Sequence, residues 1–269
     1  TKSTVPVGTN EKMKKVIKDN LTTNVDFDIV SNPEFLREGY SVEDMKNPDR
    51  TVIGSDSEKA FSIMRSLYEH LGKPIVECDL KSAEMVKYAS NAFLASKISF
   101  INEMAQICER SGADVSVVAK GMGLDSRIGP KFLNAGIGYG GSCFPKDVAA
   151  LYKTSTDQAY DFKLLRGVME VNEIQKNYFV SKITRYFGKN LSGKTIGVLG
   201  LAFKENTDDI RDSVAVEIVK QLRGLGAAIK AFDPQAMFNA KGVLGTTNIE
   251  YCLDKYEVMD NADALVILT

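Results

Sequence analysis

The order of hydrophobic and polar positions divides the chain into three stretches. Up to about Asp79, short apolar runs alternate with helical patterns. The runs predict strands at residues 25–30, 52–54 and 74–76, and the patterns between them predict helices at 10–20 and 57–70. Strands that alternate with helices are typical of a parallel sheet.

The middle stretch is predicted to be helical. Residues 82–110 contain no Gly or Pro and are dense in Ala, Met, Phe and Ile, which indicates one long and largely buried helix. A short helix is expected at 115–121 and a second long one at 162–187. A glycine-rich loop separates them.

The last stretch returns to alternation, with strands expected at 195–200, 227–232 and 263–268 and a helix at 213–225. The whole pattern predicts an α/β protein in three parts, residues 1–79, 80–188 and 189–269. The outer two are expected to be Rossmann-like, doubly wound domains, joined by a long central helix and a helical region.

Composition narrows the function. Among 269 residues, 34 Lys and Arg balance 35 Asp and Glu, so no electrostatic case exists for nucleic acid or an anionic membrane surface. Apolar runs are too short to span a bilayer, and a cytoplasmic protein is expected. The four cysteines are widely spaced and His70 is the only histidine, so neither a zinc site nor a disulfide framework is indicated.

Potentially reactive residues are most concentrated at residues 138–147, whose sequence is Gly-Tyr-Gly-Gly-Ser-Cys-Phe-Pro-Lys-Asp. Glycines let backbone N–H groups approach a ligand, and Cys143 would be presented by them. Lys146 or Lys87 would favour its thiolate, and Asp147 could orient water or a proton. The alternative is an inert cysteine in the core.

This loop resembles that of the nucleotide-sugar 6-dehydrogenases, NAD-dependent enzymes that oxidise a sugar alcohol twice to a carboxylate. Three further motifs match in the same order: Lys-Ser-Thr-Val-Pro-Val-Gly at 2–8 with Asn-Pro-Glu-Phe-Leu-Arg-Glu-Gly at 32–39, Glu-Met-Val-Lys-Tyr-Ala-Ser-Asn at 84–91, and Gly-Leu-Ala-Phe-Lys-Glu-Asn-Thr-Asp-Asp-Ile-Arg-Asp-Ser at 200–213. The family's phosphate loop, G-x-G-x-x-G, is expected before Thr1, so the first Rossmann domain is expected to be truncated at its N-terminus.

The resemblance implies roles for residues of the first stretch. Thr4 and Glu38 would lie beside the reacting carbon and the cofactor, and Glu34 would be a candidate acid or base. Phe35, Leu36 and Arg37 would contact substrate mainly through their backbone. Without the resemblance, Glu34 and Glu38 are four residues apart and would share one side of a helical turn, or simply form its solvated acidic start.

The resemblance also assigns the central helix and the loop after it. Lys87 would stabilise the oxyanion and Asn91 would hold the sugar; from the residues alone, the lysine tip could instead reach solvent. Arg127 would act in trans in a homodimer. The remaining expected contacts are to substrate from Phe132, Leu133, Asn134, Gly136, Gly138, Tyr139, Gly140 and Lys204, and to cofactor from Thr4, Glu38, Cys143, Lys146 and Arg211.

The expected reaction is oxidation of UDP-glucose to UDP-glucuronate, a polysaccharide precursor, with NAD as cofactor and a thiohemiacetal and thioester on Cys143. GDP-mannose or a UDP-N-acetylhexosamine is the nearest alternative substrate. A non-catalytic nucleotide-sugar binder and a cofactor-independent thiol hydrolase are the alternatives from other classes.

Overall fold

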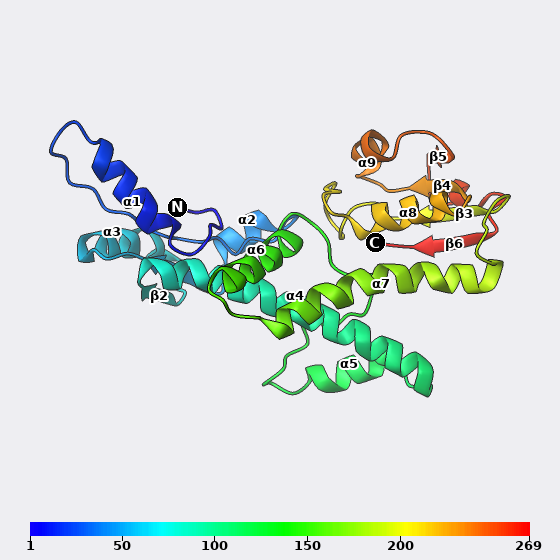
Figure 1. Cartoon of the computed structure of the whole chain (residues 1–269), viewed down its shortest axis with the longest axis horizontal. Helices are drawn as coiled ribbons and strands as arrows, with labels where there is room; N and C mark the ends of the chain where they lie inside the picture. Colours follow the sequence, from blue (N-terminus) through cyan, green and yellow to red (C-terminus); the bar gives the residue numbers. More distant parts are fainter. The chain divides into compact units, whose positions relative to one another are not determined.

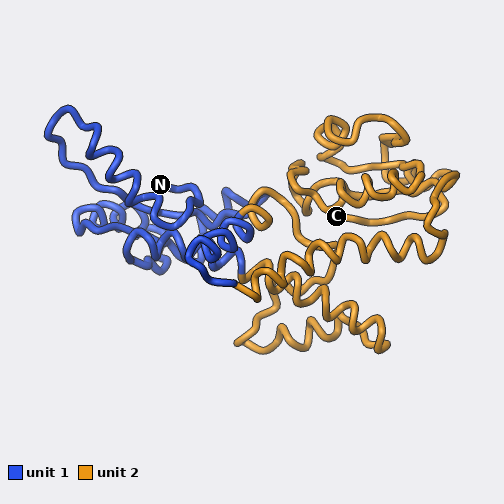
Figure 2. Tube along the Cα trace, viewed as in Figure 1, with its two compact units in different colours: residues 1–92, 147–161 blue, residues 93–146, 162–269 orange.

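The computed structural model describes all 269 residues. They form two compact units, drawn in different colours in Figure 2. Unit 1 comprises residues 1–92 and 147–161, and unit 2 comprises residues 93–146 and 162–269. The boundary falls within two helices, α4 (Leu80–Ser111) and α6 (Phe144–Asp157), so each unit contains part of both.

Unit 1 is built on a small parallel sheet. Its further elements are α1 (Thr9–Asn20), α2 (Ser41–Lys46), β1 (Thr51–Gly54), α3 (Glu58–Tyr68), the 3₁₀-helix η1 (Glu69–Leu71) and β2 (Ile75–Cys78). Thr51 lies opposite Ile75 and the two strands run parallel. The Ser57 side chain accepts a hydrogen bond from the Ala60 N–H and caps α3, as serine does at many helix starts.

The strand expected at residues 25–30 is absent. Only the following residue, Ser31, pairs with Gly54, in an isolated antiparallel bridge. Val25 is 56% exposed. Alternation of apolar and polar residues shows which side chains could face a core, but a strand also needs a neighbour with which to exchange hydrogen bonds, and the segment has one only at its end.

Unit 2 contains a four-stranded sheet, in the order β5-β4-β3-β6 with all neighbours parallel (Figure 1). Its elements after α4 are α5 (Val115–Gly123), α7 (Lys163–Phe187), β3 (Thr195–Leu199), α8 (Val214–Gly224), β4 (Ala228–Phe232), α9 (Met237–Leu244), β5 (Ile249–Tyr251), η2 (Glu257–Met259) and β6 (Ala264–Ile267). A hydrophobic cluster joins this sheet to α8 and to the end of α7 through Val180, Phe179 and Ile183.

The α/β class with parallel sheets is therefore confirmed, and the expected long helices agree with α4 and α7 within a few residues. Helix α6 was not predicted. Only a loop was expected between residues 121 and 162, but a proline such as Pro145 is tolerated in the first turn of a helix, where its missing N–H leaves no intrahelical bond unmade. Although α4 and α7 have 32 and 25 residues, no helix is both long and apolar enough to cross a membrane.

Candidate active site

One face of α4 carries three buried polar residues of unit 1. Glu84, Lys87 and Asn91 follow one another at helical spacing and therefore share a side of the helix. They are 3%, 5% and 6% exposed. Charged and amide side chains are rarely buried so deeply unless they are paired, so each needs a partner.

The partner of Lys87 is Glu34, with 3.8 Å between Nζ and Oε1. Nζ also lies 5.2 Å from the centre of the Phe35 ring, whose other neighbour is the Arg50 guanidinium at 3.7 Å. Because Lys87 is only 5% exposed, the alternative that its side-chain tip reaches solvent is excluded. A buried ammonium group at this place is available to stabilise negative charge.

Asn91 is hydrogen-bonded to Asp147, which follows Cys143 by four residues. Its Nδ2 donates to Asp147 Oδ2 at 2.6 Å, and both side chains are buried. The neighbouring Tyr88 is buried as well, and burial, together with the negative charge of Asp147, raises the pKa of its hydroxyl. The predicted Asn91 and Asp147 therefore lie together in unit 1.

Glu34 and Glu38 do not share a helical turn, so that expectation was wrong. Residues 32–37 are irregular, and the Leu36 N–H donates to Glu34 Oε2 at 2.6 Å. Such a local side-chain bond competes with helix formation, and it follows Pro33 directly. Arg37 is exposed and pairs with Asp44, with 2.6 Å between Nη2 and Oδ1.

Thr4 follows a segment that runs beside the Glu34 segment. The Asn32 N–H donates to the Thr1 carbonyl at 2.8 Å, and the Glu34 N–H donates to the Lys2 carbonyl at 3.3 Å. Thr4, Glu34 and Glu38 are all half-buried. The structure thus places the first two on adjoining segments, both accessible to a ligand.

Glu84 is a residue to which the sequence analysis gave no role. Its carboxylate accepts from the Gly8 N–H at 2.5 Å, from the Asn10 N–H at 2.8 Å and from Asn10 Nδ2 at 2.6 Å. It therefore caps α1 and fixes the end of the segment that carries Thr4. The sequence did contain one indication that Glu84 is buried near the site: it lies three residues before Lys87 and shares its helix face.

In unit 2 the predicted nucleophile is exposed. Cys143 directly precedes Phe144, the first residue of α6, and its Sγ lies 3.7 Å from Ser142 Oγ. Cys143 thus lies at the N-terminal end of a helix, whose first N–H groups have no partner within the helix and can bind a ligand. The reading of Cys143 as a core residue is therefore wrong. Lys146, in the first turn of the helix, is also exposed.

The glycines before the cysteine are needed because another segment approaches them closely. A Cβ atom at Gly140 would lie 2.2 Å from the Asp212 carbonyl oxygen, and one at Gly141 would lie 2.5 Å from the Phe203 ring. Lys204 and Arg211 belong to this approaching segment. The structure thus brings the Cys143 loop and the 203–213 segment together within unit 2.

Within this segment, Lys204 Nζ lies 5.6 Å from the centre of the Phe203 ring. Arg211 pairs with Asp209, with 2.6 Å between Nη2 and Oδ2.

Three aromatic rings contact one another in and beside the Cys143 loop. Phe144 makes edge contacts with Phe132 and Tyr139, with 6.1 Å between ring centres in each pair. Phe132 has a φ of 65°, which is rare for a bulky residue, so the surroundings must hold it there. Burial, and secondarily the charge of Glu173, raises the pKa of Tyr139 to about 12.

The other residues expected to contact the substrate differ in their exposure to solvent. Leu133 is buried, Asn134 and Gly136 are exposed, and Gly138 is half-buried. Arg127 is on the surface, with 87% of its side chain exposed, and pairs with Asp125 of its own loop at 2.6 Å.

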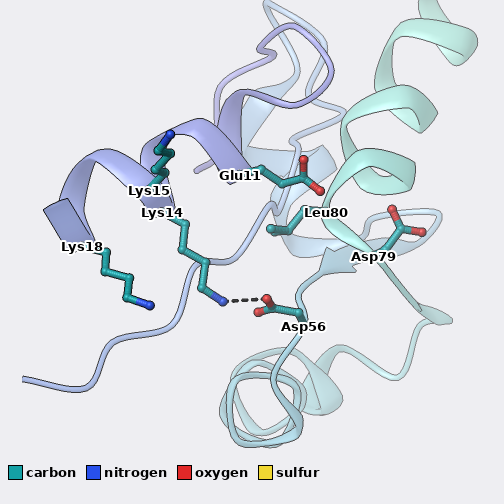
Figure 3. Close-up of a pocket in the computed structure, with 7 residues that line it drawn as sticks. All are labelled: Glu11, Lys14, Lys15, Lys18, Asp56, Asp79 and Leu80. Atoms are coloured by element: carbon teal, nitrogen blue, oxygen red, sulfur yellow. Dashed lines mark hydrogen bonds and ion pairs between the residues drawn. The ribbon is translucent and has the colours of Figure 1, made fainter.

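A separate cavity lies on unit 1 between α1 and the start of α4 (Figure 3). Its volume is about 330 Å³, and its lining residues are Glu11, Lys14, Lys15, Lys18, Asp56, Asp79 and Leu80. Three lysines and three carboxylates line it, and Lys14 is paired with Asp56 at 2.6 Å. The formal charges of its lining residues balance, and none of the expected site residues lines it.

A nicotinamide dinucleotide needs a turn for its phosphates as well as a place for its reactive ring. The N-terminus of α1 is not such a turn, because Glu84 already occupies its N–H groups. Residues 136–141 match G-x-G-x-x-G formally, but they follow a loop instead of a strand, and Asp212 and Phe203 fill the space beside the last two glycines. Neither of these two turns is therefore free to hold the pyrophosphate of such a cofactor.

Three family models cover most of the chain. They are described as the NAD binding, central and UDP binding domains of the UDP-glucose/GDP-mannose dehydrogenase family, and they match residues 1–72, 81–174 and 197–269. The middle match begins at the start of α4, and the last one covers nearly all of the four-stranded sheet.

Curated and solved relatives agree with these matches. The chain is 52% identical over 268 residues to the UDP-glucose 6-dehydrogenase TuaD of Bacillus subtilis, with 100% of this chain and 58% of that protein aligned. It is 47% identical over 274 residues to the UDP-glucose 6-dehydrogenase of Rhizobium meliloti, covering 62% of it. The solved UDP-glucose dehydrogenase of Pyrobaculum islandicum superposes with a TM-score of 0.95 at 41% identity, over 100% of this chain and 62% of that one.

The chain thus spans about three fifths of the length of these relatives. The matched models run in the same order as the three stretches of the sequence pattern, and the relatives align with the chain from end to end. The chain belongs to the UDP-glucose/GDP-mannose dehydrogenase family.

Proposed function

We propose that this chain forms part of an NAD-dependent UDP-glucose 6-dehydrogenase, which oxidises UDP-glucose to UDP-glucuronate in two steps. The observation that carries the proposal is the exposed thiol of Cys143, which directly precedes α6, the helix that holds the buried Asp147 in its first turn. UDP-glucose is the substrate in the names of the relatives at 52% and 47% identity.

The chemistry that bound NAD supplies is the acceptance of one hydride from C6 in each oxidation. Cys143 adds through sulfur to the aldehyde left by the first oxidation, which gives a thiohemiacetal. Loss of the second hydride and the hydroxyl proton leaves a thioester, and water then displaces the thiol and releases the carboxylate. The atoms balance with one water and two hydride acceptors for each sugar.

Other residues of the chain support these steps. Lys87 stabilises the oxygen anion through its ammonium group, and Asn91 holds the sugar while Asp147 orients the attacking water. Thr4 positions that water, and Glu38 or Glu34 exchanges protons with it. Phe35, Leu36 and Arg37 bind the sugar through their backbone.

The Cys143 loop and the 203–213 segment would hold the nucleotide sugar and the cofactor. The substrate contacts are assigned to Phe132, Leu133, Asn134, Gly136, Gly138, Tyr139, Gly140 and Lys204, and those to NAD to Thr4, Glu38, Cys143, Lys146 and Arg211. Arg127 is exposed, as a residue that acts in the site of a second subunit of a homodimer must be. The division into domains at residues 79 and 188 and the cytoplasmic location stay predictions.

A related substrate is the main alternative. A solved UDP-D-ManNAc dehydrogenase of Pyrococcus horikoshii superposes with a TM-score of 0.82 at 29% identity over 100% of this chain and 61% of that one. Related folds therefore act on other nucleotide sugars. The first measurement is NADH formation by the full-length protein with UDP-glucose, GDP-mannose and UDP-N-acetylhexosamines supplied separately.

Two NADH for each UDP-glucose, with the other sugars silent, is the expected result. If UDP-glucose binds but no sugar yields NADH, the protein is a binder and the proposal fails.

The second test is Cys143→Ser, which removes the nucleophile and keeps the side-chain size. UDP-glucuronate release should fall by about a thousandfold or more, because the thioester cannot form. The matched control is Cys78→Ser, at a half-buried thiol of unit 1 outside the proposed site, and it should keep its activity. Full activity of Cys143→Ser would exclude the covalent route.

A further inference from the structure

The loop at residues 136–139 belongs to no helix or strand, so its backbone polar groups need other partners. Two helices of unit 2 supply them through side-chain amides: Asn102 from α4 and Asn172 and Gln175 from α7. We call these three residues the amide clamp. They are 1%, 6% and 7% exposed, so they lie in the interior of unit 2.

Asn172 binds a single residue of the loop at two points. Its Oδ1 accepts from the Tyr139 N–H at 2.8 Å, and its Nδ2 donates to the Tyr139 carbonyl at 3.0 Å. An amide offers both an acceptor and a donor in this arrangement, and the pair of bonds also fixes which way the amide is turned.

Gly136 is held in the same manner by two separate amides. Its N–H donates to Asn102 Oδ1 at 2.8 Å, and its carbonyl accepts from Gln175 Nε2 at 2.7 Å. Gln106 Nε2 donates to Gln175 Oε1 at 3.0 Å and thereby orients the second amide. Both backbone groups of Gly136 and of Tyr139 are therefore satisfied by side chains.

We propose that the amide clamp positions the Cys143 loop for catalysis. On one side it fixes Gly136 and Tyr139, and on the other side Gly140 and Gly141 rest against Asp212 and Phe203. Only Ser142 remains between this fixed stretch and the cysteine. The clamp residues touch neither the thiol nor, in this proposal, the substrate; they act through the backbone of the loop.

Burial alone does not account for these side chains. An apolar residue at position 172 would fill the same space without a polar group that has to be satisfied, whereas a buried amide is costly unless it is bonded. The catalytic part of the inference rests on the proposed function, but the ordering of the loop does not.

The test is Asn172→Asp in the full-length protein. In its ionised form the aspartate still accepts from the Tyr139 N–H but cannot donate to its carbonyl, which it repels; the measurements are therefore made at pH 8, well above the usual Asp pKa of about 3.9. We expect amide hydrogen exchange at residues 136–143 to become about tenfold faster, as loss of one to two hydrogen bonds implies. We expect kcat for UDP-glucose oxidation to fall about tenfold to a hundredfold with KM changed far less, because misplacement by a fraction of an ångström slows the thiol steps.

Two further variants complete the experiment. Gln175→Glu keeps the bond from Gln106 but loses the one to Gly136, and it should accelerate exchange in the same residues by a smaller factor. Asn177→Asp adds the same charge to an exposed position of α7 and should leave the loop and kcat unchanged.

Unchanged exchange in the loop of both clamp variants would overturn the proposal. So would an increase spread evenly over unit 2 together with a lower urea midpoint, because that result shows a general loss of stability. If the loop loosens selectively but the unmodified protein oxidises no UDP-glucose, the ordering role stands and the proposed function fails.

Discussion

At the scale of single residues, the buried polar groups have the clearest consequences. Glu84 and Asp233 are carboxylates at 3% and 4% exposure, and each binds several backbone N–H groups: Glu84 those at the start of α1, and Asp233 those that follow β3 and β4. Neither was singled out by the sequence pattern, because a single Glu or Asp on a helix or after a strand reads as a surface residue. What makes them structural is the set of partners that the fold brings to them.

Glu84→Gln tests the cap of α1. The amide keeps an acceptor for the two Asn10 donors but turns an N–H₂ group toward the Gly8 N–H, so at least one of the three hydrogen bonds is lost, and the remaining two lose the charge of the carboxylate. We expect the free energy of unfolding to fall by about 2 kcal/mol, measured by urea denaturation. Glu103→Gln removes an exposed carboxylate from the same helix and should change it by less than about 0.5 kcal/mol. Equal effects of the two would mean that the Glu84 bonds are not stabilising.

Asp233→Asn tests the pH dependence of stability. Burial opposes ionisation of Asp233, but N–H groups of Ala236, Leu201, Gln235 and Ala202 bind the carboxylate, and together they lower its pKa. Because the folded pKa lies below the unfolded value of about 3.9, the contribution is complete above that value and is lost as the pH falls through the folded pKa.

The unmodified protein should therefore lose stability steeply below about pH 4, and Asp233→Asn should be less stable at pH 7 and flatter in acid. Urea midpoints at pH 7, 4 and 3 measure this slope. The exposed Asp260 offers the control Asp260→Asn. Identical acid slopes for the unmodified protein and Asp233→Asn would rule out this role.

At the scale of elements, the Cys143 loop depends on how closely another segment approaches it. Gly140 and Gly136 belong to the same loop, and neither has a positive φ. A Cβ atom at Gly140 would meet the Asp212 carbonyl at 2.2 Å, whereas nothing lies within 4 Å of one at Gly136. The two glycines thus differ in the space available to a Cβ atom, and neither has a positive φ that would strain a side chain by itself.

Gly140→Ala should lower the free energy of unfolding by about 1 to 3 kcal/mol, because backbone atoms must move to admit the methyl group. Gly136→Ala should be neutral or stabilising by a few tenths of a kcal/mol, through reduced freedom of the unfolded chain. Thermal unfolding of both variants gives the comparison. A loss at Gly136→Ala as large as that at Gly140→Ala would contradict the close approach.

The helices and strands also show how much of the secondary structure could be predicted from the sequence. Periodicity predicted α4, α7 and the strands β3, β4 and β6, since their apolar spacing records the face that they bury. It predicted a strand at 25–30 that has no partner, and it missed α6, whose first turn contains Pro145. Pairing and the position of a proline within a helix depend on contacts that local spacing does not record.

The residues of the candidate site were likewise only partly predictable from the sequence. Motifs drew attention to Cys143, Lys87, Asn91 and Asp147, whose residue types carry the chemistry. The supporting residues Glu84, Asn172 and Gln175 carry no motif, and only the folded chain shows what they bind. Their identities as amide or acid follow from backbone geometry that sequence spacing does not encode.

At the scale of the whole molecule, the two units differ in how their hydrophobic cores are built. Unit 2 holds a cluster of buried apolar residues that extends from Val180 to Leu268 around four strands. Unit 1 has two paired strands, and several apolar side chains of α1, α3 and β2 are more than a third exposed: Met13, Val16, Ile17, Ile63, Leu67 and Val76. A two-stranded sheet is marginally stable unless helices cover it well.

We therefore expect this chain to unfold in two steps, with unit 1 first. In hydrogen exchange at increasing urea, the amides of β1 should lose protection at lower urea than those of β3, although both strands have buried interior residues. The helices give an internal check, because residues 80–92 of α4 belong to unit 1 and residues 93–111 to unit 2. Protection within α4 should consequently be lost first at its N-terminal end. Coincident transitions for β1 and β3 would show instead that the chain unfolds as one cooperative body, and the weaker core of unit 1 would then have to be stabilised by unit 2.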